Sequence, residues 1–133
     1  MTENPLFKKL ALKPGKCLLV LNAPPDFLPG LGQPPEGITL VTQAQGHHDA
    51  VLLFVKDRAD FHARIHDSLA PLEYDGLFWL AYPKKTGQIP SDLARDDFWK
   101  LMESTGLRPV MQIALDDTWS ALRFRPAELV KKK

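Results

Sequence analysis

The sequence predicts one α/β domain with a three-layer, mostly parallel sheet of about six strands, a typical sheet size. Short runs such as KCLLVL (16–21) and DAVLLFV (49–55) are continuously apolar, which is typical of strands buried on both faces. Helical patterns separate these runs, and strands that alternate with helices form parallel sheets. The last two apolar runs are joined by Asp116 and Asp117, which predicts a C-terminal antiparallel hairpin.

Size and charge favour an ordinary globular domain. The chain has 133 residues, which fits one hydrophobic core over residues 1–133. Lys and Arg number 17 against 16 Asp and Glu, so the net charge of +1 gives no reason to expect a nucleic-acid partner. The one basic run, Lys131–Lys133, belongs to a predicted flexible tail over 127–133.

The cysteine count, the apolar stretches and the N-terminal residues predict the cellular compartment. Cys17 is the single cysteine, so no internal disulfide forms and a reducing compartment is expected. No apolar stretch approaches the ~18 residues of a membrane span. The first residues lack the apolar core and cleavage site of a signal peptide. We therefore expect a cytoplasmic protein without a membrane partner.

In the N-terminal half the elements alternate with breakers. Residues 1–14 form a predicted helical segment, with its helix over 5–12 stopped by Pro14 and Gly15. The first strand covers 17–21. Residues 22–36 contain five prolines and two glycines, which leaves room for one turn, at 26–31. Strands are predicted over 37–43 and 49–55.

In the C-terminal half the helix boundaries carry clear signals. Asp57 is the predicted N-cap of a helix over 58–70, which Pro71 closes. A strand over 76–83 and a polar loop over 84–90 follow. Ser91 or Asp92 is the predicted cap of a second helix over 92–105, which Gly106 ends. Strands over 108–115 and 118–126 form the closing hairpin.

Two stretches together resemble a known family. HHDAVLLFV (47–55) resembles the motif of Rossmann-like methyltransferases in which an acid opens a buried strand, and LAPLEYDGLFWLAYPK (69–84) resembles their next strand. The resemblance covers residues 15–126 and implies a methyltransferase-type sheet. More narrowly, FKKLALKPG (7–15), YPKKTGQIPSDL (82–93) and DDTWSALRF (116–124) resemble a group of small bacterial proteins that share a domain of unknown function.

The sequence departs from the methyltransferase pattern where that family binds S-adenosylmethionine. A glycine-rich turn after the first strand would admit the cofactor, but this chain reads LNAPPDF (21–27), and two prolines remove two N–H donors. The acid expected after the second strand is absent from VTQAQG (41–46). We therefore expect a degenerate methyltransferase-like fold, no cofactor, and no S-adenosylmethionine-dependent activity.

The carboxyl ends of the parallel strands are the predicted position of any ligand site. The loops that meet there supply Asn22, Asp57, Lys84, Lys85, Thr86, Asp116, Asp117 and Trp119. Lysines that face acids beside an indole could bind a small anionic ligand or transfer a proton. The alternative is that the lysines are solvated, the acids only form a turn, and Trp119 packs in the core.

Two further groups are weaker candidates. Arg123 and Arg125 are two positions apart on the last strand, so they share a face and could hold a phosphate, or else pair with nearby acids. His62 and His66 are four positions apart on a helix, as metal ligands can be, and His47 and His48 open the third strand. No HExxH motif is present, so we expect surface histidines and no metal.

Connectivity predicts an oligomer. Right-handed crossovers place the helices at 58–70 and 92–105 on the same face of the sheet. The opposite face, which carries Leu77, Trp79 and Ala81, then receives only the N-terminal segment and the proline-rich segment. Exposed apolar surface costs ~25 cal/mol per Å². We therefore expect a homodimer that buries this face.

Two classes of function remain open at this point. The first is a non-catalytic binding or protein-interaction module, whose partner is another protein. The second is a small enzyme or an anion- or nucleotide-binding protein that uses the loops 84–87 and 116–120.

Overall fold

The structure is a computed structural model that describes residues 10, 12, 15–25, 27, 37–43, 48–84, 93, 97–115 and 118–129. The described chain forms strands, α-helices and short 3-10 helices. In chain order they are β1 (Cys17–Leu21), β2 (Thr39–Val41), β3 (His48–Phe54), α3 (Arg58–Leu69), β4 (Leu72–Pro83), α4 (Asp97–Leu101), η1 (Glu103–Thr105), β5 (Leu107–Ala114), β6 (Trp119–Pro126) and η2 (Ala127–Leu129).

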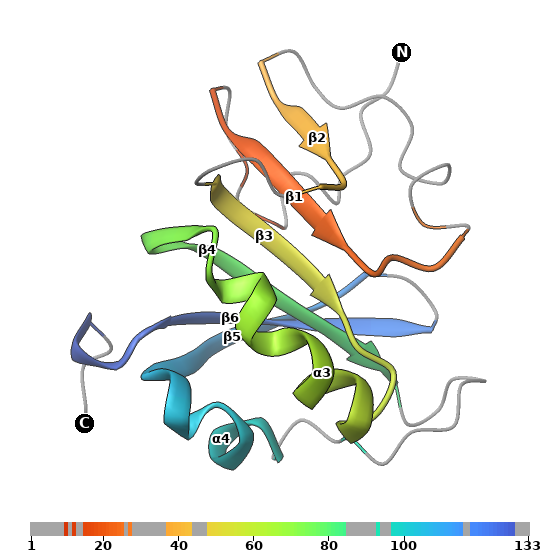
Figure 1. Cartoon of the computed structure of the whole chain (residues 1–133), viewed down its shortest axis with the longest axis vertical. Coiled ribbons are helices and arrows are strands. Elements are labelled where there is room, and N and C mark those ends of the chain that lie inside the picture. The colour runs from red at the N-terminus through yellow and green to blue at the C-terminus, as the bar shows by residue number, and fades with distance from the viewer. Residues whose placement is uncertain are drawn as a thin grey trace.

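The described strands form one six-stranded sheet in the order β2-β1-β3-β4-β6-β5 (Figure 1). β2, β1, β3 and β4 are parallel, whereas β6 is antiparallel to both β4 and β5. The predicted mostly parallel α/β sheet with a C-terminal hairpin is therefore confirmed. The chain leaves β1 toward β2 on one side and returns to β3 on the other, so the topological switch point lies between β1 and β3.

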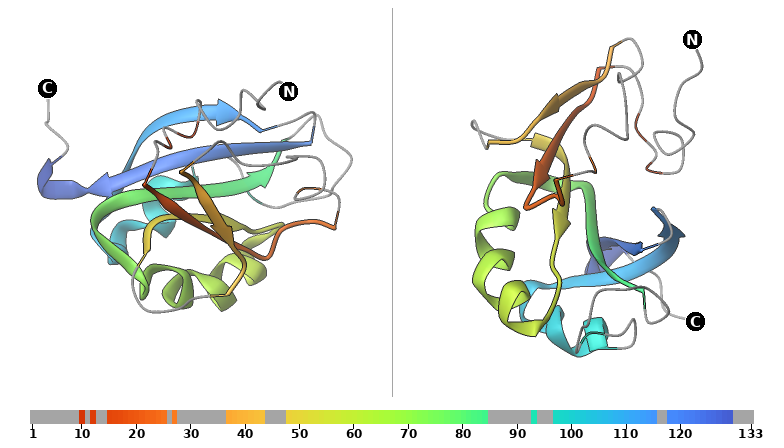
Figure 2. Two further views of the ribbon diagram at one scale, coloured as in Figure 1. Left: turned by 90° about the horizontal axis from the view of Figure 1, so that it is seen from above. Right: turned by 90° about the vertical axis from the view of Figure 1, so that its right-hand side faces the viewer.

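Both described α-helices cover the same face of the sheet, as the crossover rule predicts (Figure 2). Phe61 and Ile65 of α3 and Phe98 of α4 are buried there. They pack in one apolar cluster with strand residues such as Phe78 and Phe124. This cluster fixes the helices against the sheet, because burial of apolar area is the main stabilising contribution.

Described side chains from the N-terminal third of the chain pack on the opposite face of the sheet. Leu10, Leu12 and Phe27 are buried in a second apolar cluster against that face. Trp79 is 0% exposed, and its Nε1 donates a hydrogen bond to the Leu10 carbonyl over 3.1 Å. Trp79 and Ala81 are therefore buried rather than exposed, whereas Met111, which shares this face through its pairing with Arg123, is 48% exposed.

Local capping signals locate α3 correctly. The Asp57 side chain accepts a hydrogen bond from the Asp60 N–H over 2.8 Å, which is the expected N-cap contact. The helix then ends at Leu69, just before Pro71. The boundaries 58–70 predicted from the sequence agree with the structure to within one residue.

The second helix is shorter than the predicted 92–105. Leu93 lies outside any helix, and α4 begins only at Asp97. Leu93 and Phe98 are buried in the same cluster although five positions apart, a spacing that on one helix separates side chains by about 140°. A continuous helix would therefore expose Leu93. Gly106, with φ +77°, ends the segment as predicted.

Other boundaries differ or fall outside the described residues. β4 begins at Leu72 rather than at residue 76, and β2 is limited to Thr39–Val41. Leu10 and Leu12 are not helical, and the remainder of the predicted helix 5–12 is not described. Most of the turn at 26–31 and the caps Ser91 and Asp92 are not described either. η2 occupies the first residues of the predicted 127–133 tail.

No helix among the described residues has the length and the apolar composition that a membrane-spanning segment requires.

Candidate functional site at the carboxyl edge

Four predicted site residues lie at the carboxyl edge of the sheet. Asn22 follows β1, Asp57 follows β3, Lys84 follows β4, and Trp119 begins the antiparallel β6 at the same edge. Four other candidates lie outside the residues that the structure describes. These are Lys85, Thr86, Asp116 and Asp117.

Asn22 bridges the switch point between β1 and β3. Its backbone φ is +62°, a left-handed conformation that asparagine tolerates better than most residues. Its Nδ2 donates to the Phe54 carbonyl over 2.8 Å and to Asp60 Oδ2 over 3.1 Å. The amide therefore joins the ends of two strands to the first turn of α3. Asn22 is itself exposed, so this network lies at the surface of the carboxyl edge.

Asp60 is the centre of this network. Its Oδ2 accepts a second hydrogen bond from the Lys56 N–H over 3.1 Å, and its Oδ1 accepts one from Arg64 Nε over 2.7 Å. The carboxylate side chain is only 12% exposed. Burial raises the pKa of Asp60, but the hydrogen bonds and the charges of Arg64 and Lys56 outweigh burial and lower that pKa overall. Asp60 is therefore ionised at neutral pH and fully engaged.

Aromatic rings occupy the same edge on the face opposite the helices. Phe54 lies between Phe27 and Trp119, with ring centroids 4.7 Å and 5.1 Å away in edge-to-face geometry. All three rings are buried. The loop after β1 turns at Pro24, whose carbonyl accepts a hydrogen bond from the Phe27 N–H over 3.1 Å, and this turn brings Phe27 to Phe54. Trp119 is thus a core residue, in agreement with the alternative stated from the sequence.

Asp57 and Lys84 have structural contacts at this edge. Asp57 caps α3, so one of its carboxylate oxygens is already used. The Lys84 N–H donates to the Thr118 carbonyl over 2.8 Å, which extends the pairing of Pro83 with Trp119. Lys84 and Thr118, one from each of the two candidate loops, are therefore neighbours.

Arg123 lies away from the carboxyl edge, on the middle of β6. In the sheet register it is opposite Trp79 of β4 and Met111 of β5. Arg125 is two positions on, so both arginines lie on the face that Trp79 occupies, and Arg108 is opposite Arg125. The three arginines are half-buried. The shared face inferred from the sequence is correct, but it is separate from the Asn22 network.

The histidines do not gather into a site in the described part of the chain. His62 and His66 lie on the exposed side of α3. His48 is buried at the amino end of β3, and His47 is not described. Among the described residues, no three side chains of the types that bind metals lie close enough to share an ion.

Cys17 lies at the amino end of β1, opposite the candidate site. Its Sγ is 3.6 Å from His48 Nδ1, and its N–H donates to Asp49 Oδ1 over 3.1 Å. Burial, and then the negative charge of Asp49, raise the pKa of the Cys17 thiol. The thiol is therefore protonated at neutral pH, which argues against a nucleophilic role.

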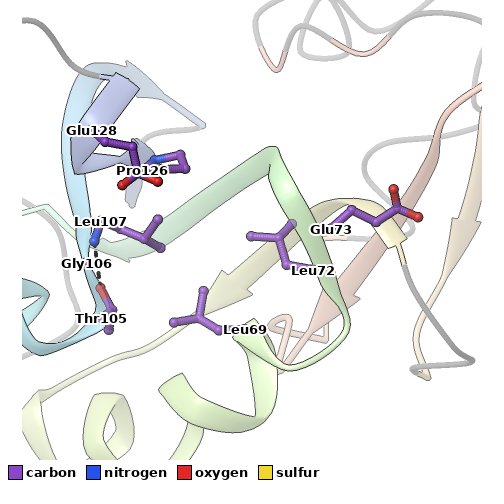
Figure 3. A pocket seen from close by; sticks show the side chains of 8 residues that line it. All are labelled: Leu69, Leu72, Glu73, Thr105, Gly106, Leu107, Pro126 and Glu128. Atoms are coloured by element: carbon purple, nitrogen blue, oxygen red, sulfur yellow. Dashed lines mark hydrogen bonds between the residues drawn. The ribbon is translucent and has the colours of Figure 1, made fainter.

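A cavity that the sequence did not indicate lies at this amino edge (Figure 3). Its volume is about 300 Å³. The end of α3 and the start of β4 form one side, and the η1–β5 junction with the end of β6 forms the other. The lining residues are Leu69, Leu72, Glu73, Thr105, Gly106, Leu107, Pro126 and Glu128.

Comparison with solved structures identifies the class of fold. Ribosomal protein L11 methylase from Lactobacillus delbrueckii subsp. bulgaricus matches with a TM-score of 0.54 at 11% identity, over 92% of this chain and 80% of that one. A protein assigned as a type 11 methyltransferase from Sulfolobus solfataricus matches with a TM-score of 0.52 at 12% identity, over 95% and 94%. LepI in complex with SAM matches with a TM-score of 0.53 at 13% identity, over 91% and 39%.

These similarities show the fold alone. The chain has a Rossmann-like α/β fold of the methyltransferase type, as the sequence motifs implied. No protein-family model and no curated protein matches the sequence.

Proposed function

We propose that this chain is a non-catalytic binding module on a methyltransferase-like fold. The observation that carries the proposal is the Asn22–Phe54–Asp60 network at the switch point. Ligands of open α/β sheets bind outside the carboxyl ends of the strands at this point. Here the chain's own amide and carboxylate occupy the β1–β3 junction, and their hydrogen bonds are already made within the protein.

The residues present do not fit S-adenosylmethionine. Pro24 and Pro25 offer no N–H where the first loop would approach a cofactor, and Phe27 packs its ring against Phe54 beside the switch point. Binding would require the Asn22–Asp60 contact to break and Phe27 to leave the core. Removal of a buried Phe side chain costs about 3–5 kcal/mol, so this opening is strongly unfavourable.

A titration tests this proposal. Isothermal calorimetry with S-adenosylmethionine and S-adenosylhomocysteine, each to about 1 mM, should give no saturable heat. Because the cost of opening the switch point weakens binding, we expect a Kd above about 1 mM, which corresponds to a binding free energy of less than about 4 kcal/mol. An active methyltransferase measured in parallel verifies the reagents. A Kd in the micromolar range for either compound would refute the proposal.

The proposed partner is another protein, and a second copy of this chain is the first case to test. β5 is an eight-residue edge strand, and Val110 and Met111 on it are 39% and 48% exposed. Exposed edges with apolar side chains favour strand pairing between chains. Pro109 and the irregular register before Met111 restrict such pairing to the second half of β5.

Sedimentation velocity at several concentrations tests the homodimer. We expect a concentration-dependent dimer that Met111→Lys dissociates, because a charge on a paired edge is unfavourable. Gln43→Lys, on an exposed residue near the other end of the sheet, is the matched control. A monomer at every concentration would reject the homodimer proposal, and the proposed partner would then be a different protein.

A second candidate function is anion binding at the carboxyl edge. The Lys84–Thr118 hydrogen bond favours it, since that contact joins one described residue of each candidate loop. Inorganic phosphate and ATP, titrated against the intrinsic fluorescence of the wild type and of Lys84→Gln, test the idea. Saturable binding that Lys84→Gln weakens would support it, and an unchanged signal would reject it.

We also infer that the protein belongs to the bacterial group that its sequence resembles, and that it is located in the cytoplasm.

A further inference from the structure

We propose that β5 is a self-complementary edge on which two copies of this chain pair antiparallel, with a two-fold axis at Gln112. This pairing rests on the function proposed above, whose partner is another protein, and it defines the register in which a second copy binds. A two-fold axis between two neighbouring strands makes them antiparallel. The pair would join the two described six-stranded sheets into one continuous sheet.

The hydrogen-bond register of the hairpin decides which backbone groups of β5 face outward. The Leu115 N–H donates to the Trp119 carbonyl over 2.9 Å, so these two residues form a hydrogen-bonded pair. Hydrogen-bonded and non-hydrogen-bonded pairs alternate along an antiparallel ladder, so every second residue of β5 before Leu115 bonds to β6. The backbone N–H and C=O groups of Gln112 and Ala114 therefore point away from β6, toward the position of an added strand.

The second half of β5 is the part suited to such a strand. Pro109 has no N–H to donate, and the ladder is irregular between Pro109 and Met111, so the first half fits an added strand poorly. Residues 110–114, the edge segment, are exposed except for the half-buried Ile113, and Met111 is 48% exposed. No residue of the edge segment is charged, although charged side chains commonly protect sheet edges from pairing.

The edge segment is complementary to itself about its centre. When Gln112 lies opposite Gln112 of the second copy, Met111 lies opposite Ile113, and Val110 lies opposite Ala114. The axis repeats each contact, so the two apolar pairs of Met111 with Ile113 form on either side of it. Both side chains lie on the face opposite the helices, where Ile113 already packs against the apolar cluster. The pairing would bury apolar surface that a single copy exposes.

The charges that flank the edge segment favour the same arrangement. Arg108 lies two positions before the segment, and the chain leads from its other end toward Asp116 and Asp117. In an antiparallel pair, the end of one strand that carries Arg108 lies beside the end of the other that leads to the two acids. The two copies of Arg108 are then on the order of 27 Å apart, at ~3.4 Å per residue, so salt screens their repulsion.

Cysteine crosslinking of the full chain measures this register directly. In a Cys17→Ser background, Gln112→Cys should form a disulfide-linked dimer under mild oxidation, because residues opposite each other in a hydrogen-bonded pair have Cα atoms about 5.5 Å apart. Ala114→Cys, on the same strand and face, is the matched control. It should not crosslink alone, because its two copies would be ~14 Å apart along the strands. An equal mixture of Val110→Cys and Ala114→Cys should crosslink, since these residues lie opposite each other.

Two further variants and one measurement separate the possible outcomes. Added to the Gln112→Cys chain, Met111→Lys should abolish the crosslink and Gln43→Lys should not, with thermal melting to verify the fold of each variant. Equal crosslinking of the Gln112→Cys and Ala114→Cys chains, or none from Gln112→Cys where sedimentation shows a dimer, would overturn this register and leave the homodimer in place. A monomer at every concentration would also overturn it, and the S-adenosylmethionine titration would still decide the function proposed above.

Discussion

At the scale of single residues, Asn22 decides whether the switch point is open. Its side chain donates to the Phe54 carbonyl and to Asp60, and its backbone adopts a left-handed conformation at φ +62°. Glycine would keep the conformation and lose the hydrogen bonds, whereas alanine would lose both. The two substitutions therefore separate the contribution of the side chain from that of the backbone.

We expect Asn22→Gly to lower the free energy of unfolding by about 0.5–1.5 kcal/mol, the usual contribution of such a hydrogen bond. Asn22→Ala should cost about 1 kcal/mol more, because a non-glycine residue with a Cβ is strained at this φ. Urea denaturation measures both, and Gln43→Ala, at an exposed position after β2, is the control. If Asn22→Gly were neutral, the amide would not hold the strands together.

Asp60 gives the network a dependence on pH. Its pKa in the folded protein is lowered below the ordinary value of 3.8, so the folded state binds the proton less well than the unfolded state. Its contribution to stability is therefore complete above the unfolded pKa and is lost as the pH falls through the folded pKa.

The stability difference between the wild type and Asp60→Asn should accordingly be larger at pH 6 than at pH 3. Carbon-detected NMR of the Asp60 carboxyl should show a midpoint below 3.8, and Arg64→Gln should raise it, because the Nε hydrogen bond is removed. A midpoint at or above 3.8 in the wild type would contradict the proposed balance between burial and hydrogen bonding.

At the scale of elements, α3 depends on its first turn. Asp57 caps the helix, and Asp60 in the same turn holds the end of β1 through Asn22. Asp57→Ala should destabilise the protein by about 1 kcal/mol, while Asp57→Ser should retain most of the stability because serine also caps helices. Thermal denaturation measures both. Asp67→Ala, on the exposed side of α3, should change stability by less than about 0.5 kcal/mol.

The two helices, α3 and α4, show which helix boundaries can be predicted from the sequence and which cannot. The cap at Asp57, the stop before Pro71 and the turn at Gly106 are local signals, and each was located correctly. The start of α4 was missed because Leu93 reaches the core from outside the helix. The spacing of apolar residues alone does not distinguish these two arrangements.

At the scale of the whole molecule, the order of strands and helices was sufficient to predict the fold. The sheet, its hairpin and the shared face of the helices follow from general rules of connectivity. The site was less predictable. Asn22 and Asp60 are 38 positions apart and meet only through the parallel register of β1 with β3. The cavity likewise combines residues from α3, β4, β5 and η2, which no local motif links.

Trp79 lies on the face that a homodimer was expected to bury, and it is already buried within one copy of the chain. Leu10, Leu12 and Phe27 pack on the part of this face around Trp79 and Phe54, so a second copy is not needed to bury these two rings. The remaining exposed apolar side chains of the described sheet include Val110 and Met111 on β5. The dimer proposed above pairs β5 of one copy with β5 of the other, so it should be insensitive to changes near Leu10.

The claim that the switch point is filled by the protein itself is the one to test first. Native mass spectrometry of the freshly purified chain reports any small molecule that remains bound, together with the number of subunits. We predict the mass of the polypeptide alone, or of two polypeptides, with nothing added. A mass increment that matches an S-adenosyl compound or a nucleotide would show that the switch point can open, and it would contradict the account.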